Sequence, residues 1–229
     1  EKVAPYRYSV YLDDAEISVD YAPSHKSAVY ELDFTKKEDT YLIINVGNGT
    51  LSETKEGAIG GYQTIDKSNT KVYLYLETQQ KAEVAGALKD GKFVREAKSV
   101  DGRNEALILK YKDSGKINLR YGISFISVEQ AQINLEQEIK TYDVNTVADT
   151  GFKIWNEALG KIEVEGSEED KIVFYTSLYR TYERMINISE NGQYFSAFTG
   201  KVHSDEGIPF YTDDWIWDSY RAHHPLNVL

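Results

Sequence analysis

The spacing of apolar residues constrains the fold most strongly, and it changes character once along the chain. Apolar and polar residues alternate in short runs from Tyr6 to about Phe125. The clearest runs are Val29–Phe34, Lys71–Leu76 and Ile117–Phe125. A period of two places successive side chains on opposite faces of a strand. Because no helical period interrupts these runs, we predict an antiparallel β-sandwich.

Glycine-containing dipeptides separate the predicted strands. Glycine tolerates positive φ, so each dipeptide predicts a tight turn. They are Asn48-Gly49, Gly60-Gly61, Asp90-Gly91, Asp101-Gly102 and Ser114-Gly115. The segment Lys81–Leu88 fits either a helix or a strand, and its pattern leaves both open.

Helical spacing begins after the last strand. Ser127 and Gln130 form a capping-box pattern, in which the hydroxyl accepts from the third amide and the glutamine reaches back. A helix of about four turns, ending near Tyr142, is predicted from this start.

Two further helices follow in the pattern. The second carries an apolar stripe from Val147 to Ile162. Ser167 precedes three acidic residues, which favour the positive end of a helix dipole, so it is predicted to open the third. The apolar stripe of the third helix runs to Met185 and Ile186.

The last part of the chain begins with turn and loop signals. Asn191-Gly192 predicts a tight turn. Residues 193–210 contain several glycines and a proline, and we predict an irregular loop there.

A final helix is predicted after this loop. Its candidate N-caps are Thr212, Asp213 and Asp214. On such a helix, Asp218 and Arg221 lie three positions apart and share a face. Pro225 disfavours helix at His224, so the limits of this helix stay open.

Composition excludes several classes of function. A net charge of -11 and a pI near 4.9 disfavour a nucleic-acid partner, which requires a basic face. No apolar run approaches the roughly 18 residues that cross a bilayer, so we expect no membrane insertion by this segment. The absence of cysteine excludes a disulfide framework, a thiol nucleophile and a zinc-thiolate site.

Trp217, Asp218 and Arg221 carry the densest chemistry. A tryptophan face stacks on the C–H face of a pyranose, a carboxylate accepts from two vicinal hydroxyls, and an arginine holds that carboxylate ionised. An ion pair on a helix face beside a core tryptophan is the alternative. His223 and His224 are adjacent, so on a helix their side chains diverge by about 100° and do not share one small metal ion.

Two acidic groups are weaker candidates. His203 precedes Asp205 and Glu206, which favours an exposed polar loop over a metal cluster. Asp213-Asp214 favours a helix cap over a pair of catalytic acids.

Three segments carry a resemblance to a known family. They are FISVEQAQINLEQE, KIVFYTSLYRTYERM and PFYTDDWIWDSYRAHHPLNVL. Together they resemble glycoside hydrolase family 92, whose members are secreted, calcium-dependent, exo-acting α-mannosidases. The family pattern corresponds here to Trp217, Asp218, Arg221, Ala222, His224, Pro225 and Leu226.

The resemblance implies a multi-domain chain, β and then α. Residues 1–126 correspond to an antiparallel, supersandwich-like β-sandwich, incomplete at its N-terminus. Residues 127–165 correspond to linker helices. Residues 166–229 correspond to the first elements of an (α/α)6 toroid, truncated at Leu229.

The resemblance also implies hydrolysis of terminal α-linked mannose, in particular α-1,2-linked mannose, with inversion. One carboxylic acid protonates the glycosidic oxygen, and a carboxylate roughly 6.5–9.5 Å away activates water. Both groups and the calcium ligands are expected beyond Leu229. No catalytic and no metal residue is therefore expected in this chain, and the fragment alone should be inactive.

The implied partner is a mannose-containing glycan, and the implied location is secreted, periplasmic or on a bacterial cell surface. The implied substrate-binding residues are Trp215, Trp217, Asp218, Arg221 and His224. One alternative is a non-catalytic carbohydrate-binding or adaptor module. A second is another toroid enzyme, such as a polysaccharide lyase.

Overall fold

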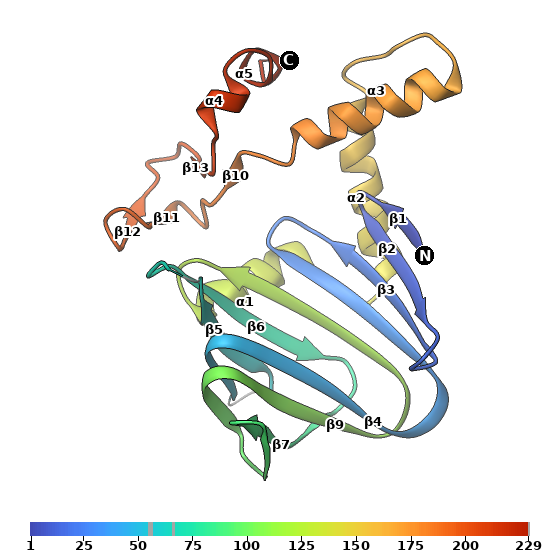
Figure 1. Ribbon diagram of the computed structural model, residues 1–229, viewed down its shortest axis with the longest axis vertical. Coiled ribbons are helices and arrows are strands. Elements are labelled where there is room, and N and C mark those ends of the chain that lie inside the picture. Colours follow the sequence, from blue (N-terminus) through green and yellow to red (C-terminus); the bar gives the residue numbers. More distant parts are fainter. Residues whose placement is uncertain (55–56, 66, 229) are drawn as a thin grey trace.

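The computed structural model describes residues 1–54, 57–65 and 67–228 (Figure 1). Its strands are β1 (Lys2–Ala4), β2 (Arg7–Leu12), β3 (Ile17–Pro23), β4 (Ser27–Glu53), β5 (Ile59–Thr64), β6 (Lys71–Thr78), β7 (Glu83–Lys89), β8 (Lys92–Arg95), β9 (Ser99–Ser124), β10 (Ile186–Asn187), β11 (Gln193–Ser196), β12 (Lys201–Ser204) and β13 (Tyr211–Thr212). Its helices are α1 (Val128–Glu138), α2 (Val144–Leu159), α3 (Glu168–Thr181), α4 (Ile216–Ser219) and α5 (His223–Leu226). Leu229, where the third predicted domain ends, lies outside the described residues.

The long strands β4 and β9 organise the sheet. They pair antiparallel along most of their length, and their register shifts between Asp33 and Thr40. Figure 1 shows the two strands curling back in this region. The sheet has the order β1-β2-β3-β4-β5-β6-β9-β7-β8 with an additional β4–β9 pairing, and it folds over at the bend into two layers. The predicted antiparallel β-sandwich is confirmed.

Two apolar clusters hold the layers and helices together. The first lies between the layers and includes Leu107 and Ile117, which come from opposite sides of the bend in β9. The second joins the other face of the sheet to α1 and α2, and includes Val29 and Leu135. Because side chains alternate along β4, Val29 belongs to the second cluster while Tyr30 packs against the first.

Glycines explain where the turn predictions succeed and fail. Asp90-Gly91 forms the predicted turn between β7 and β8, with φ of 50° and 72°. A Cβ on Gly49 would lie 1.9 Å from the carbonyl oxygen of Tyr62, so this glycine permits close approach of β4 and β5. The remaining four predictions are wrong because these dipeptides lie inside strands: Asn48-Gly49, Gly60-Gly61, Asp101-Gly102 and Ser114-Gly115.

The cap of α1 is half of the predicted capping box. Ser127 Oγ accepts a hydrogen bond from the backbone N–H of Gln130 at 3.1 Å. The side chain of Gln130 does not reach back, since its Nε2 donates to Asn134 Oδ1 at 2.8 Å. The helix therefore begins as predicted, and Gln130 is free to bond one turn further on.

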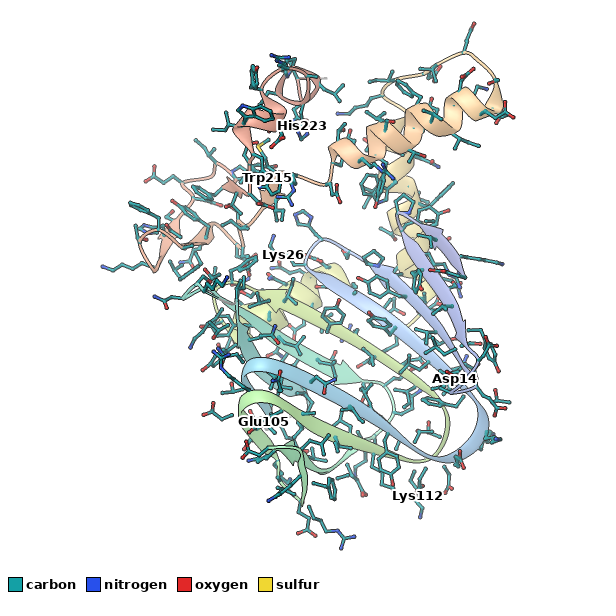
Figure 2. All side chains as sticks on the ribbon, viewed as in Figure 1. Asp14, Lys26, Glu105, Lys112, Trp215 and His223 are labelled. Carbon is teal, nitrogen blue, oxygen red and sulfur yellow. The ribbon has the colours of Figure 1, made fainter. Side chains whose placement is uncertain are left out.

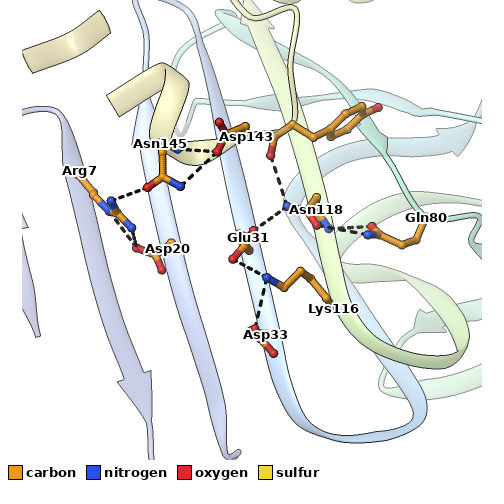
Figure 3. Close-up of polar contacts among 10 residues, drawn as sticks. Arg7, Asp20, Glu31, Asp33, Gln80, Lys116, Asn118, Asp143 and Asn145 are labelled. Carbon is orange, nitrogen blue, oxygen red and sulfur yellow. Dashed lines mark hydrogen bonds and ion pairs between the residues drawn. The ribbon is translucent and has the colours of Figure 1, made fainter. Parts of the chain in front are cut away.

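Side chains of the sheet hold the linker between α1 and α2. The predicted extension of α1 to Tyr142 is wrong, because the helix ends at Glu138 and Ile139 is extended. Arg120 donates to the carbonyl oxygen of Ile139. Asn118 Nδ2 donates to the carbonyl oxygen of Tyr142 at 3.3 Å (Figure 3). These bonds satisfy carbonyls that a further helical turn would have used.

The remaining elements follow the predictions in part. Ser167 caps α3 as predicted, accepting from the backbone N–H of Asp170 at 3.2 Å. Helix α3 ends at Thr181, so Met185 and Ile186 are not helical and that part of the predicted stripe is wrong. The open segment 81–88 lies in strand β7 from Glu83 onward, and the predicted loop 193–210 contains the β11–β12 hairpin. None of the described helices is both long and apolar enough to span a bilayer.

Candidate functional site

The chain turns back after α3 through a second, small sheet. Strand β10 pairs antiparallel with β13. Asn191-Gly192 adopts φ of 49° and 81° and forms the predicted turn. This return places Arg184 beside Asp213, with Nη1 and Oδ2 2.8 Å apart. The small sheet therefore fixes the residues that precede α4 relative to those that follow α3.

Two short helices, α4 and α5, carry most of the residues singled out in the sequence. No side chain caps α4, which begins after Trp215, so the predicted cap is wrong. Asp214 instead accepts from Ser219 Oγ at 2.7 Å and pairs with His224 Nε2 at 3.2 Å. Pro225 lies in the first turn of α5, where its missing N–H is not needed, so His224 is helical against expectation.

A pocket of about 310 Å³ lies between the end of α3 and the α4–α5 segment. Figure 2 shows Trp215 and His223 on the arm of the chain that ends in α4 and α5, away from the sandwich. Of the five predicted substrate-binding residues, Trp215 and Asp218 line the pocket. The full lining is Ser177, Arg180, Thr181, Glu183, Arg184, Trp215, Asp218, Ser219 and His223.

The other three predicted residues lie outside the pocket lining. Trp217 is 86% exposed. Arg221 donates from Nε to the hydroxyl of Tyr220 at 2.7 Å, and His224 is held by its carboxylate partner. The expectation that Asp218 and Arg221 share a helix face is wrong, because α4 ends before Arg221. Within the described residues, Arg221 forms no ion pair with Asp218.

Arg184 and His223 set the polar character of the pocket. The guanidinium carbon of Arg184 lies 4.2 Å from the centre of the Trp215 ring, a cation–π contact that fixes the indole. His223 Nε2 is buried and has no hydrogen-bond partner among the described residues. Asp218 and Arg180 line the same pocket, so a carboxylate acceptor and a guanidinium donor are available there for the hydroxyls of a polyol.

Arg180, Arg184 and His223 are pocket residues that the sequence interpretation missed. Arg184 lies within the range of the predicted third helix and was not a candidate site residue. Helix α3 ends at Thr181, and in the segment that follows Arg184 lies over the Trp215 ring. The adjacency of the histidines was the available signal for His223. The two rings lie 6.4 Å apart; His223 lines the pocket, whereas His224 pairs with Asp214.

The described residues do not fit a calcium site. In residues 1–54, 57–65 and 67–228, no three His, Asp or Glu side chains gather in a way that could hold a metal ion. His203 instead stacks on Tyr194, with ring centres 5.6 Å apart, and lies 2.6 Å from the hydroxyl of Thr199.

Solved structures of longer proteins share this fold. The family GH92 inverting mannosidase BT2199 from Bacteroides thetaiotaomicron matches with a TM-score of 0.88 and 28% identity, covering 98% of this chain and 32% of that chain. The family GH92 α-mannosidase BT3965 from the same organism matches with a TM-score of 0.89 and 21% identity, covering 97% and 32%. The structure of BT3965 in complex with mannoimidazole matches with a TM-score of 0.88 and 21% identity, covering 97% of this chain and 32% of that chain.

The chain thus spans about a third of the length of these solved relatives. None of the curated proteins compared with the chain matches it. The model of the glycosyl hydrolase family 92 N-terminal domain matches residues 1–124, more than half of the chain, and the model of the family 92 catalytic domain matches residues 130–229. The resemblance noted in the sequence is confirmed, and the chain belongs to glycosyl hydrolase family 92.

Proposed function

We propose that this chain belongs to a glycoside hydrolase that removes terminal α-linked mannose from glycans with inversion. The pocket that joins Trp215 and Asp218 to His223 carries the proposal, because it offers a ring face beside donors and acceptors for hydroxyl groups. The similarity to an inverting mannosidase, at 28% identity over 98% of the chain, supports it. Within this proposal the sandwich comprises residues 1–126, the linker helices 127–165 and the start of the catalytic domain 166–229.

The five proposed substrate-binding residues divide into three tasks. Asp218 accepts hydrogen bonds from hydroxyls of the terminal mannose. Trp215 and Trp217 present ring faces to its C–H groups. Arg221 and His224 form the polar border of the subsite. Because both tryptophans are more than half exposed, their faces are accessible to a sugar.

This chain contributes binding and orientation to the reaction. Inversion needs an acid that protonates the leaving oxygen and a base that activates water on the opposite face of the sugar. We propose that these two carboxylates, and the ligands of a calcium ion, belong to the rest of the intact protein. A sugar held at its hydroxyls presents its anomeric carbon in a fixed direction, which lowers the entropic part of the barrier.

The finer features of the activity are also proposals. We propose α-1,2-linked mannose as the substrate linkage, and a secreted, periplasmic or cell-surface location in a bacterium. The support is the family membership together with the Bacteroides origin of the matching mannosidases.

Substitution of Asp218 tests the proposal. In the intact protein, Asp218→Ala should lower kcat/KM for a synthetic α-mannoside by about 30- to 1,000-fold, because hydroxyl contacts worth about 2–4 kcal/mol in the transition state are lost. Glu206→Ala removes another exposed carboxylate of the same segment, outside the pocket lining, and should leave kcat/KM unchanged. A kcat/KM within twofold of wild type in Asp218→Ala would remove that residue from the site.

The separate chain gives a second test. The 229-residue chain should show no turnover of an α-mannoside with calcium present. Turnover would contradict the assignment of the acid and base to the rest of the protein. An intact protein that binds mannosides without turnover would support the carbohydrate-binding alternative instead.

A further inference from the structure

Glu190 is a buried carboxylate at the junction between the sandwich and the segment from β10 to α5, called the pocket segment because it carries Trp215 and Asp218. Its residue exposure is 2%, although it lies in a segment whose other charged residues are mostly exposed. Burying an ionised carboxylate is unfavourable unless hydrogen bonds and charges compensate it. The hydrogen-bond partners of Glu190 therefore indicate the role of this buried carboxylate.

Both oxygens of Glu190 bond to residues of the first half of the chain. Oε1 accepts from the backbone N–H of Phe125, just past the end of β9, at 2.9 Å. Oε2 accepts from Asn134 Nδ2, on α1, at 2.8 Å. These contacts span 65 and 56 positions of sequence. One side chain thus bridges the sandwich, α1 and the segment that leads to the pocket.

Asn134 is itself fixed in the orientation that Glu190 requires. Its Nδ2 also donates to the carbonyl oxygen of Ile123 at 2.9 Å, and its Oδ1 accepts from Gln130 Nε2 at 2.8 Å. Both amide hydrogens and the amide oxygen are therefore used, and a flipped amide would lose all three bonds. This accounts for the side chain of Gln130 turning away from its own helix cap.

A positive charge faces the same junction. In the view of Figure 2, Lys26 lies at the end of the sandwich nearest the arm with Trp215 and His223. Burial lowers the pKa of Lys26, while the negative charges of Glu190 and Glu138 act in the opposite direction. Lys26 therefore compensates part of the buried negative charge.

A short run of hydrogen-bonded backbone connects Glu190 to the strand that precedes the pocket residues. Its backbone pairs with Gln193 across the Asn191-Gly192 turn, with N–O distances of 2.7 and 3.1 Å. Two residues earlier, Ile188 N donates to the carbonyl oxygen of Phe210 at 3.0 Å, next to β13. From β13 the chain runs directly into Trp215 and α4. A displacement at Glu190 is therefore transmitted along paired backbone to the pocket.

We propose that Glu190 is a positioning residue: its carboxylate fixes the segment that carries Asp218 and Trp215 against the end of β9 and α1. The structural part of this inference stands independently, whereas its effect on turnover rests on the proposed function. Among the described residues, the hydrogen bonds of Glu190 go to Phe125, Asn134 and Gln193, none of which lines the pocket, so Glu190 acts through the backbone that it holds. Its loss shifts Asp218 relative to the rest of the site.

Hydrogen exchange in the intact protein tests the contact itself. In Glu190→Ala, the amide of Phe125 loses its acceptor, and its exchange should accelerate at least tenfold, as should the exchange of residues 186–188 and 210–212. Glu206→Gln, a change at an exposed glutamate of the same segment, should leave these rates unchanged. Unchanged exchange at Phe125 in Glu190→Ala would overturn the proposal.

Kinetic measurements on Glu190 variants test whether the contact affects turnover. Glu190→Ala and Asn134→Ala should each lower kcat/KM about 10- to 100-fold, as a displacement of about 1 Å at the site would, and the double variant should be no worse than the poorer single one. Glu190→Gln keeps the size and one acceptor, and it should fall between wild type and Glu190→Ala. If Glu190→Ala does not fold, Glu190→Gln and Asn134→Ala carry the test.

The outcomes separate this inference from the proposed function. Faster exchange with unchanged kcat/KM would overturn the positioning role. Additive losses in the double variant would overturn the coupling of Glu190 with Asn134. A wild-type protein without α-mannosidase activity would contradict the proposed function. The exchange rates alone would then test whether Glu190 holds the pocket segment against Phe125 and Asn134.

Discussion

Gly122 shows how a single residue determines the packing of α1 on the sheet. A Cβ at Gly122 would lie 2.1 Å from the carbonyl oxygen of Ala131 and 3.0 Å from Leu135 Cβ. Both residues belong to the buried face of α1. Alanine at this position must push the helix away from β9, since the neighbouring atoms include backbone that cannot turn aside.

We expect Gly122→Ala to lower the free energy of unfolding by about 2–3 kcal/mol, the range typical of overpacking in a tight core. Gly115→Ala is the matched control in the same strand, because the three atoms nearest to its Cβ all belong to the flexible side chain of Lys37, the closest at 3.1 Å. That variant should stay within about 0.5 kcal/mol of wild type. Chemical denaturation of both variants checks these values. Equal unfolding midpoints for Gly122→Ala and wild type would refute the close approach of α1 to β9 at Gly122.

At the scale of elements, Asp143 links the start of α2 to the sandwich. Its Oδ1 accepts from the backbone N–H of Asn145 at 3.0 Å, and Oδ2 accepts from the hydroxyl of Thr146 at 2.6 Å. Asn145 Oδ1 in turn accepts from Arg7 Nη1 at 2.9 Å (Figure 3). The hydroxyl of Thr146 and then the amide of Asn145 hold the pKa of Asp143 below its usual range.

The Asp143→Ala variant should lose about 1 kcal/mol of stability near neutral pH, the usual contribution of an N-cap. Because the pKa of Asp143 is lower in the folded state, the stability that its charge contributes is fully present above the unfolded pKa near 4. That contribution is lost as the pH falls through the folded pKa. The difference from wild type should therefore narrow as the pH falls from the unfolded pKa through the lower folded pKa of Asp143. Asp149→Ala, at an exposed site of the same helix, should show neither effect. A pH-independent difference would argue against the cap.

Local patterns predicted the elements better than they predicted their ends. The period of two identified the strands, and Ser127 and Ser167 marked two helix starts correctly, because these signals depend on neighbouring residues. The end of α1 depends instead on Arg120 and Asn118, which come from a distant strand. Gly49 resembled a turn residue because its real constraint, the approach of another strand, is invisible in sequence.

The same limit applies to the site. The family resemblance indicated Trp215 and Asp218, and both line the pocket. It did not identify Arg184, because the pocket forms only where α3 ends and the chain returns through β13. A resemblance over short segments supplied the family, whereas the grouping of side chains required the tertiary structure.

On the scale of the whole molecule, burial is strongly uneven. The apolar clusters lie within the sandwich and helices α1 and α2. After residue 182, the buried side chains among the described residues are Ile188, Glu190 and Ser219. Large apolar side chains there are mostly exposed, including Phe198 at 100% and Trp217 at 86%. The free energy of folding therefore comes chiefly from the first two-thirds of the chain.

This unevenness predicts two levels of protection in the 229-residue chain. Amides of β4 and β9 should exchange only through global unfolding, since both strands are paired on their two sides and enclose the core. Amides of residues 193–228 should exchange faster by local opening, because few buried contacts hold them. Mass-spectrometric exchange at several denaturant concentrations distinguishes the two, since only globally exchanging amides follow the full denaturant dependence. Equal dependence for both regions would mean that the pocket segment folds as one cooperative unit with the sandwich.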